Sequence, residues 1–151
     1  MTATDLVIER VASDKRRFMH LLIIGDESEA MIDRYLGRGE LYAGFVGGTA
    51  VAVCVTTVES EGVTEVKNLA VLPQWQGRGI GRRMLAHVEK LNAGRRMILG
   101  TGETPSTLRF YRSCGYVESH RIPDFFTDNY PHPIVEEGVR LRDMIYFAKD
   151  V

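Results

Sequence analysis

The chain has 151 residues, of which 44% are hydrophobic and 26% are charged, and its formal net charge is −1. A chain of this length and composition is expected to form a single domain, residues 1–151, and its near-zero charge gives no support to a nucleic-acid partner. The two cysteines, the four scattered histidines and the lack of a long apolar run or signal peptide predict no disulfide framework, no metal, no membrane partner and a reduced cytoplasmic location.

The first part of the chain is predicted to contain a strand, two helices and a β-hairpin. In order, these are a strand over 5–11, a helix capped by Asp14 and running to about Ile24, a helix from Ser28 or Glu29 to Gly37 or Gly39, and strands over 41–46 and 49–58. Gly47-Gly48 between the two apolar runs is typical of a hairpin turn. Residues 50–58 are apolar on both faces, which predicts a central strand covered on both sides.

The second part is predicted to alternate strands and helices. In order, these are a strand over 62–72, a helix over 77–92 ended by Gly94, a strand over 96–100, a helix from Thr104 or Ser106 to near Gly115, a strand over 116–122, a loop with one helical turn over 123–138, and a strand over 139–149. The helix over 77–92 carries one apolar stripe at helical spacing. This order predicts an α/β fold with a mixed sheet and helices on both faces.

Residues 66–81 are the most informative segment, because an apolar strand runs through the turn at Pro73 into a glycine-rich loop that begins a helix. Glycine has no Cβ, so such a loop leaves backbone N–H groups open to a ligand. The helix start adds unpaired N–H groups and the positive end of its dipole, where Arg78, Arg82 and Arg83 are disfavoured unless an anion is bound. The segment predicts a phosphate or pyrophosphate site, with a solvated basic helix face as the alternative.

Two common phosphate-binding motifs are excluded by spacing. A P-loop requires Gly-Lys-Ser/Thr, but Gly81 is followed by two arginines. The dinucleotide pattern G-x-G-x-x-G also fails, because Arg82 or Met84 stands where the last glycine is required. The pattern that is present is Gln76-x-x-Gly79-x-Gly81.

This glycine pattern, after residues 68–73 (Asn-Leu-Ala-Val-Leu-Pro), closely resembles the acetyl-CoA site of the GNAT superfamily of N-acetyltransferases. A second block, Phe110-Tyr111-x-x-x-Gly115-Tyr116, looks like the later helix of that family. The resemblance covers residues 41–122 well, and the tail over 125–145 looks like an uncharacterised bacterial branch. It implies a mostly antiparallel sheet of about seven strands, with a splay between the strands over 62–72 and 96–100 that receives the thioester arm of CoA.

The resemblance also implies a set of cofactor-binding residues. Leu69 and Val71 are expected to pair with the pantetheine arm through their backbone, and the Val71 N–H is a candidate donor to the reacting carbonyl. Thr104 stands where the family often has asparagine, which puts that one contact in doubt. The residues expected to hold acetyl-CoA are Leu69, Ala70, Val71, Gln76, Gly77, Arg78, Gly79, Ile80, Gly81, Arg82, Thr104, Phe110 and Tyr111.

Tyr111 and Glu65 are the expected catalytic residues. The family has a tyrosine at the position of Tyr111, where it protonates the leaving thiolate, and several members have a glutamate near Glu65 that deprotonates the amine. Strand alternation predicts that Glu65 shares a face with Leu69 and Val71 and that Asn68 lies on the opposite face. The structural alternatives are a packed helical tyrosine and a strand carboxylate paired with Lys67.

The resemblance places the acceptor between residues 25–40 and 123–138. Phe125, Phe126 and Tyr130, with Glu65, are the expected substrate contacts, although the aromatic residues could instead form a small core of their own. Both segments are rich in acidic residues, which would attract a cationic amine. His132 is an alternative base.

The predicted function is transfer of acetyl from acetyl-CoA to a primary amine of a small molecule or peptide, in a ternary complex, by a monomer or homodimer. The alternative is an acyl-CoA-binding or sensing domain without catalysis. An unrelated nucleotide-binding module is disfavoured by the failed motif spacings.

Overall fold

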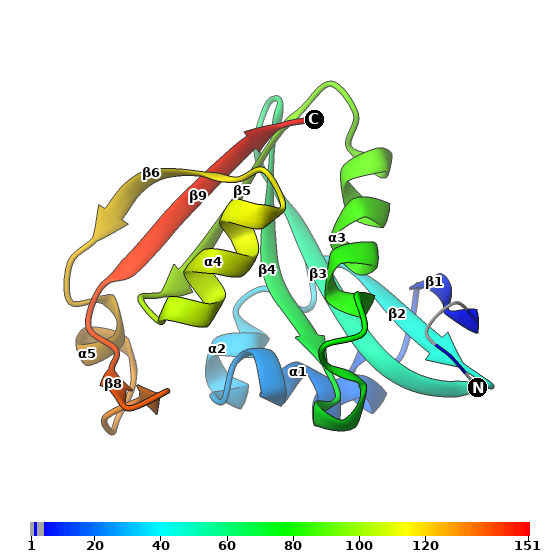
Figure 1. The fold of residues 1–151 in the computed structure, drawn as a ribbon, viewed down its shortest axis with the longest axis horizontal. Helices are drawn as coiled ribbons and strands as arrows, with labels where there is room; N and C mark the ends of the chain where they lie inside the picture. The colour runs from blue at the N-terminus through cyan, green and yellow to red at the C-terminus, as the bar shows by residue number, and fades with distance from the viewer. Residues whose placement is uncertain (1, 3–4) are drawn as a thin grey trace.

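The structure is a computed structural model that describes residue 2 and residues 5–151. Its centre is a seven-stranded sheet in the order β1-β2-β3-β4-β5-β9-β6 (Figure 1). Neighbouring strands are antiparallel except for β4 and β5, which are parallel. This arrangement confirms the expected mixed, mostly antiparallel sheet of about seven strands.

The bounds of the elements follow the chain. The strands are β1 (Val7–Val11), β2 (Glu40–Val46), β3 (Thr49–Ser60), β4 (Val63–Val71), β5 (Arg96–Gly102), β6 (Val117–Ile122), β7 (Val135–Glu136), β8 (Val139–Arg140) and β9 (Met144–Asp150). The α-helices are α1 (Met19–Gly25), α2 (Glu29–Asp33), α3 (Ile80–Leu91), α4 (Pro105–Ser113) and α5 (Phe125–Asn129), and the 3₁₀ turns are η2 (Lys15–Phe18) and η3 (Pro73–Trp75). None of the helices in the described residues is long and apolar enough to cross a membrane.

Two hydrophobic clusters cover the two faces of the sheet. The apolar stripe of α3, including Ile80, Met84 and Val88, packs in one cluster with Phe147 of β9. Helices α1 and α2 contribute to the other cluster. Strand β3 contributes side chains to both clusters and is buried from Val51 to Thr57, which confirms the central strand that the sequence predicted.

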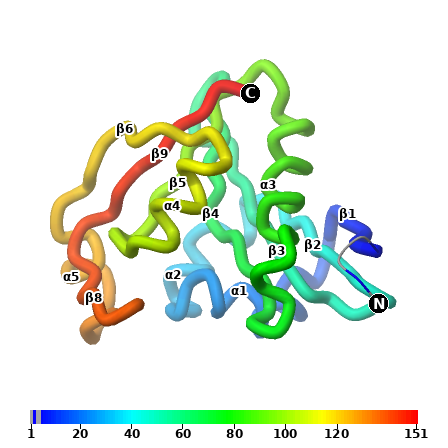
Figure 2. Tube along the Cα trace, in the orientation of Figure 1, coloured from blue at the N-terminus to red at the C-terminus, as the bar shows by residue number. Residues whose placement is uncertain are grey.

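Strands β4 and β5 separate part-way along their length. They pair only from Val63 with Arg96 to Val66 with Leu99, although β4 continues to Val71 and β5 to Gly102. Figures 1 and 2 show the two strands diverging below this point, with α4 beside the gap. The far part of β4 therefore lacks a neighbouring strand on that side, so its backbone groups there need other partners.

Strand β4 also contains a β-bulge. Val55 of β3 pairs with Asn68, whereas the next residue, Thr56, pairs with Val66, so Lys67 is the extra residue. A bulge interrupts the alternation of side chains between the two faces. Val66 lies in the α3-facing cluster, as Leu69 does, although the two are an odd number of positions apart, at 66 and 69.

Several helix ends differ from those predicted. Gly77 and Gly79 have φ values of 75° and 80°, so α3 begins at Ile80 rather than at residue 77. Asp14 has a φ of 52° and its side chain caps nothing, because a 3₁₀ turn precedes α1. At the other end of α3, Asn92 is the C-cap and Gly94 lies in the following turn, where its N–H donates to the Val151 carbonyl.

Helix α2 and the C-terminal region also differ in detail from the prediction. Ser28 caps α2 through a hydrogen bond from the Met31 N–H at 3.2 Å, as predicted, but the helix ends at Asp33 rather than at Gly37 or Gly39. The single strand predicted over 139–149 is divided. Its first residues form β8 in a hairpin with β7, and β9 begins at Met144.

Candidate active site

A cleft of about 660 Å³ lies between the end of β4, the glycine loop and α4. The expected cofactor residues that line it are Leu69, Val71, Gln76, Gly77, Gly79, Ile80, Gly81, Arg82, Phe110 and Tyr111. Trp75, Ser106 and Thr107 complete the wall, and none of them was predicted from the sequence to bind the cofactor. Trp75 directly precedes Gln76, the first residue of the glycine pattern, and its large apolar side chain beside an otherwise polar loop was the available signal.

The glycine loop presents open backbone donors to this cleft. The left-handed conformation of Gly77 and Gly79 lets the chain turn sharply from η3 into α3. Gly79 is the N-cap of α3, and no side chain caps this helix end. The first N–H groups of α3 have no carbonyl partner within the helix, so they are available to an anion.

The side chains of the motif are largely engaged within the protein. Gln76 Nε2 donates to the Val71 carbonyl at 2.9 Å, which fixes the loop to the end of β4. Arg82 donates to the Ser113 carbonyl at 3.2 Å and to its Oγ at 2.7 Å, while Arg78 lies over the Trp75 ring at 4.6 Å. Among the three arginines of the motif, only Arg82 lines the cleft.

Three expected cofactor residues lie outside the cleft wall: Ala70, Arg78 and Thr104. Ala70 is on the other face of β4, in the cluster with α1 and α2. Thr104 is buried, and its hydroxyl donates to Thr107 Oγ1 at 2.9 Å. A contact of this hydroxyl with the pantetheine arm stays a prediction.

A second cavity, of about 250 Å³, meets the cleft. It lies between the C-terminal end of α1, the splayed parts of β4 and β5, and the segment carrying α5, β7 and β8. Leu69, Thr107 and Tyr111 line both spaces. The splay between the strands is therefore the place where two ligands, one from each cavity, would meet.

Tyr111 stands at this junction. Its ring packs against Phe110, Tyr116 and Phe147, with ring centroids 5.1 to 6.2 Å apart. Its hydroxyl makes no hydrogen bond to any part of the chain that the structure describes. Burial raises the pKa of this phenol above its ordinary value, so the hydroxyl keeps its proton at neutral pH.

Comparison with known proteins identifies this arrangement. Residues 37–118 match the family model described as the acetyltransferase (GNAT) domain. An uncharacterised N-acetyltransferase of Bacillus subtilis, YvbK, is 30% identical, with all of both chains covered. The chain belongs to the GNAT family.

Solved structures of GNAT relatives agree with this assignment. A GNAT acetyltransferase from Elizabethkingia anophelis, solved with acetyl-CoA bound, superposes with a TM-score of 0.91 at 30% identity, covering 97% of this chain and 99% of that one. A protein described as IAA acetyltransferase from Bacillus cereus gives a TM-score of 0.89 at 33% identity, with the same coverage. The acetyl-CoA expected from the sequence is thus the ligand of a full-length GNAT relative.

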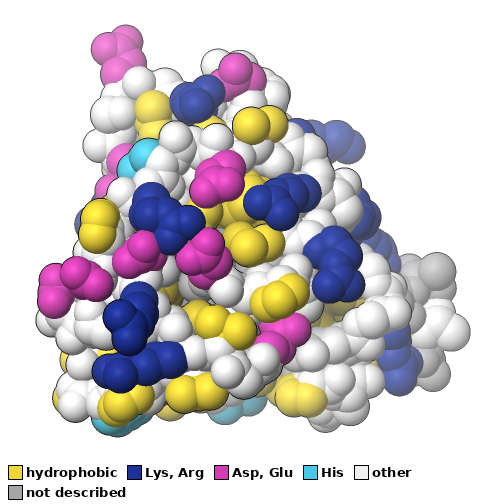
Figure 3. Space-filling model, turned by 60° about the vertical axis from the view of Figure 1, so that its left-hand side comes forward, with side chains coloured by type: hydrophobic (Ala, Val, Ile, Leu, Met, Phe, Trp, Pro, Cys, Tyr) yellow, Lys and Arg dark blue, Asp and Glu magenta, His cyan; other side chains and the backbone are white. Residues whose placement is uncertain are grey.

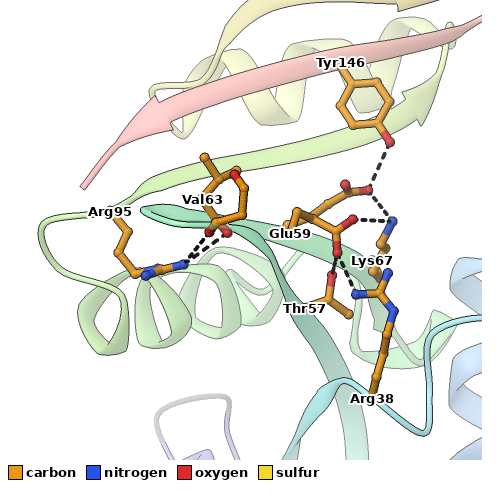
Figure 4. A network of polar contacts seen from close by, with 9 residues as sticks. Arg38, Thr57, Glu59, Val63, Lys67, Arg95 and Tyr146 are labelled. Atoms are coloured by element: carbon orange, nitrogen blue, oxygen red, sulfur yellow. Dashed lines mark hydrogen bonds and ion pairs between the residues drawn. The ribbon is translucent and has the colours of Figure 1, made fainter.

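Glu65 occupies a different place from the one that alternation predicted. Its Oε2 accepts a hydrogen bond from the Tyr146 hydroxyl at 3.0 Å and lies 2.9 Å from the Lys67 ammonium (Figure 4). Ile145 and Phe147, the neighbours of Tyr146 in β9, face the α3 cluster, so Tyr146 points to the opposite face of the sheet. Glu65, which contacts Tyr146, therefore lies on that opposite face as well. The prediction that Glu65 shares a face with Leu69 was wrong, because the bulge at Lys67 reverses the alternation.

Glu65 is buried but does not line either cavity, whereas Lys67 lines the second one. The Lys67 ammonium is also 3.9 Å from Glu59, which accepts hydrogen bonds from Thr57 and Arg38 at 2.7 Å each. Figure 4 shows Thr57 and Glu59 of β3, Lys67 of β4 and Tyr146 of β9 converging, with Arg38 reaching in from the segment before β2. Lys67 is therefore part of the cavity wall and is held there by two carboxylates.

The aromatic residues expected at the acceptor site are divided between two roles. Phe126 and Tyr130 line the second cavity, and their rings stack 5.6 Å apart. Phe125 lies outside its wall and packs edge-on against Phe126 at 5.4 Å. The three rings thus form a small core of their own, and two of them also face the cavity.

Asp26 and Glu136 line the second cavity, although the sequence had marked them only as members of acidic segments. Asp26 Oδ1 accepts hydrogen bonds from the Tyr130 hydroxyl at 2.8 Å and the Ser28 N–H at 3.1 Å. Burial raises the pKa of both carboxyls above the ordinary range, with a smaller contribution from Glu27.

His132, the alternative base, lies outside the wall of the second cavity, with its Nε2 3.4 Å from Glu27. Across residues 2 and 5–151, His, Cys, Asp and Glu side chains form no group suited to a metal ion.

Proposed function

We propose that this GNAT protein transfers the acetyl group of acetyl-CoA to a primary amine of a small molecule or peptide, by direct attack while both are bound. The observation that carries the proposal is the junction of two cavities at Leu69, Thr107 and Tyr111. Direct transfer requires the two reactants to be held in contact, and this junction is where they would be.

The residues present fit acetyl-CoA. The open N–H groups at the start of α3 suit its pyrophosphate, and Arg82 adds a positive charge at the cleft wall. The part of β4 beyond Val66 has backbone groups without a strand partner on the β5 side, which suits the amides of the pantetheine arm. When bound, acetyl-CoA supplies an acyl group whose carbon–sulfur bond breaks as the carbon–nitrogen bond forms.

Tyr111 is proposed to donate its phenolic proton toward the sulfur, which gains one proton as the amine loses one. The raised pKa of the phenol keeps it protonated, so it is a hydrogen-bond donor at every pH at which the enzyme is expected to work. The Val71 N–H is proposed as a donor to the reacting carbonyl oxygen, since Val71 lines the cleft at the end of β4.

Glu65 is proposed as the final acceptor of the amine proton, reached through Lys67. Lys67 Nζ would pass a proton to Glu65 Oε2, 2.9 Å away, and take one from the amine. Glu65→Gln is expected to lower the acetylation rate at neutral pH by about 10- to 100-fold, with recovery at alkaline pH where the free amine is abundant. A rate reduced equally at all pH values would instead show that Glu65 only supports the structure.

The proposed function is tested by mixing the protein with acetyl-CoA and a panel of primary amines, and following CoA release together with the acetylated product. Amine-dependent CoA release supports the transferase. Calorimetric binding of acetyl-CoA without release for any amine would favour the acyl-CoA-binding alternative, and absence of binding would overturn both.

The surface is compatible with a small-molecule or peptide acceptor. Figure 3 shows acidic and basic side chains intermingled on one face, with hydrophobic side chains between them. No nucleic acid, a cytoplasmic location and a monomeric or homodimeric state remain our predictions. Sedimentation with and without acetyl-CoA measures the last of these.

A further inference from the structure

We propose that the acceptor is a compact amine carrying a second cationic group, a short linear diamine in its simplest form. Its reacting nitrogen would lie beside Asn68 and Tyr111, and its remote ammonium between Asp26 and Glu136. This inference rests on the proposed transferase function and specifies the substrate class of the same site.

The wall of the second cavity carries uncompensated negative charge. Asp26 and Glu136 both line it, and the cation in the wall, Lys67, is already paired with Glu65 at 2.9 Å and lies near Glu59. Arg34 lowers the pKa of Asp26, but it has the smallest effect of the groups around that carboxyl. The Arg34 guanidinium instead donates a hydrogen bond to Asn129 Oδ1 at 3.4 Å. A cationic ligand would therefore meet two carboxylates that have no strong cationic partner.

The electrostatic surroundings of Asp26 and Glu136 also favour a cationic ligand. Desolvation is the main effect that raises the pKa of Asp26 and of Glu136, and the charge of Glu27 adds to it at both. Glu27 itself lies 3.4 Å from His132 at the surface. Glu136 is exposed and Asp26 is half-buried, whereas Asn68 is buried, so the two carboxylates lie toward the outer end of the cavity, where a bound ammonium would relieve the unfavourable charge.

Asn68 provides an independent indication at the inner end. Asn68 also lines the second cavity and is only 4% exposed, and its Oδ1 has no hydrogen-bond donor among the described residues. Its Nδ2 donates to the Leu22 carbonyl at 2.9 Å and to the Tyr35 hydroxyl at 3.1 Å, which fixes which end of the amide is the oxygen. Buried acceptors are normally paired, so this oxygen lacks a donor that the N–H of an amine would supply.

The position of Asn68 relates this acceptor to the chemistry. It directly precedes Leu69, which lines both cavities together with Tyr111. Gly25 packs directly against the Asn68 side chain, since a Cβ at residue 25 would lie 2.2 Å from Oδ1, and both residues line the second cavity. An amine bound at Asn68 would thus be next to the junction, with its remote charge directed to the carboxylates at the outer end.

The experiment compares 1,4-diaminobutane with butylamine, which has the same carbon chain and no second charge. Initial rates with saturating acetyl-CoA give kcat/KM for each amine in the native protein, in Asp26→Asn, in Glu136→Gln and in the double variant. Glu61→Gln, an exposed carboxylate in the β3–β4 turn, is the matched control. We expect a preference for the diamine of at least about tenfold, retained in the control and lost in the double variant, with unchanged acetyl-CoA affinity.

The same proteins are titrated calorimetrically with the diamine in the absence of acetyl-CoA, at low and high salt. Salt-sensitive binding that disappears in the double variant supports the ammonium site even if no turnover is seen, in which case only the transferase proposal fails. Equal kcat/KM values for the two amines, or a diamine preference that survives in the double variant, would overturn the inference and leave the transferase proposal standing.

Discussion

The Tyr111 side chain lies at the junction of the two cavities, and its hydroxyl makes no hydrogen bond within residues 2 and 5–151. Replacing Tyr111 by Phe keeps the ring and its packing, so the fold and the cofactor cleft should be retained. We expect kcat to fall by about 10²- to 10⁴-fold, because a proton donor is lost, while the dissociation constant of acetyl-CoA stays unchanged. Steady-state kinetics and calorimetry measure the two effects.

Tyr116→Phe is the matched control for this variant. The Tyr116 hydroxyl donates to Glu89 at 2.9 Å, and the side chain lines neither cavity, so its loss should lower thermal stability and leave kcat near the native value. Because burial raises the pKa of Tyr111, the native enzyme should also show no loss of rate near pH 10 from ionisation of this phenol. Unchanged kcat in Tyr111→Phe would remove it from the mechanism.

Gly79 tests the backbone conformation of the cofactor loop. Its φ of 80° is unfavourable for any residue with a Cβ, by about 1–2 kcal/mol, so Gly79→Ala should move the start of α3 away from its present position. We expect weaker acetyl-CoA binding by calorimetry and a lower melting temperature. Gly37→Ala, at a site without positive φ and with nothing within 4 Å of the new Cβ, should change neither. Native affinity in Gly79→Ala would show that the loop conformation is not needed for binding.

Strand β4 shows most clearly which features of the fold could be predicted from the sequence and which could not. Apolar periodicity was enough to place this strand, α3 and the central β3, because burial on a sheet or a helix stripe repeats regularly. The register was not predictable, because the bulge at Lys67 depends on how β3 and β4 pair. That one extra residue decides on which face of the sheet Glu65 lies. It therefore also keeps Glu65 away from both cavities.

The acceptor site was predictable only as a region. The glycine motif located the cofactor cleft, since a local loop and a helix start form most of it. Asp26, Asn68 and Glu136 instead come together from a helix end, a strand and a hairpin that are distant in sequence. Their meeting depends on the tertiary fold, and no local pattern carries that information.

The α5 segment is anchored to the sheet by Arg121 of β6. Arg121 donates to Asp143 at 2.7 Å and to Glu103 through both terminal nitrogens, and the other Asp143 oxygen accepts from the Asp124 N–H at 2.9 Å. Asp124 is the N-cap of α5, which carries Phe126 toward the acceptor cavity. Arg121→Gln should increase hydrogen exchange in α5 and raise the KM for the amine without changing acetyl-CoA affinity.

This anchor also has a defined pH dependence. The hydrogen bond from the Asp124 N–H, followed by the one from Arg121, holds the pKa of Asp143 below its ordinary value. The stabilisation is therefore complete above the ordinary pKa near 4 and is lost as the pH falls through the lower folded value. The protection factors of the α5 amides, which remove the intrinsic pH dependence of exchange, should be constant from pH 7 to about 5. Arg96→Gln, which breaks an exposed pair with Asp150, is the control and should leave α5 unchanged.

The splay of the sheet connects the two cavities to the stability of the fold. Beyond Val66 and Leu99, β4 and β5 no longer pair, yet β5 continues along β9 to Gly102 and β4 along β3 to Val71. Each strand is thus held from its outer side while the inner side is open. A ligand that pairs with β4 in this gap would bridge the two halves of the sheet.

Binding of acetyl-CoA should therefore protect β4 selectively. Amides in residues 67–71 that point toward β5 have no strand partner, and we expect their hydrogen exchange to slow on binding, together with those of residues 77–82 at the glycine loop. Amides of β1 and β2, which pair with each other on the opposite side of the sheet, should not change. Protection confined to the glycine loop would mean that the pantetheine arm does not pair with β4.

Binding of acetyl-CoA should also raise the stability of the folded protein by mass action. At a free acetyl-CoA concentration of about 100 times its dissociation constant, ligand binding adds about 2.7 kcal/mol to the free energy of unfolding. For a chain of this size the melting temperature should rise by about 5–11 °C. Gly79→Ala, with its loop displaced, should show a smaller rise at the same ligand concentration, whereas Tyr111→Phe should show the native rise. That contrast separates residues that hold the cofactor from the one proposed to act on it.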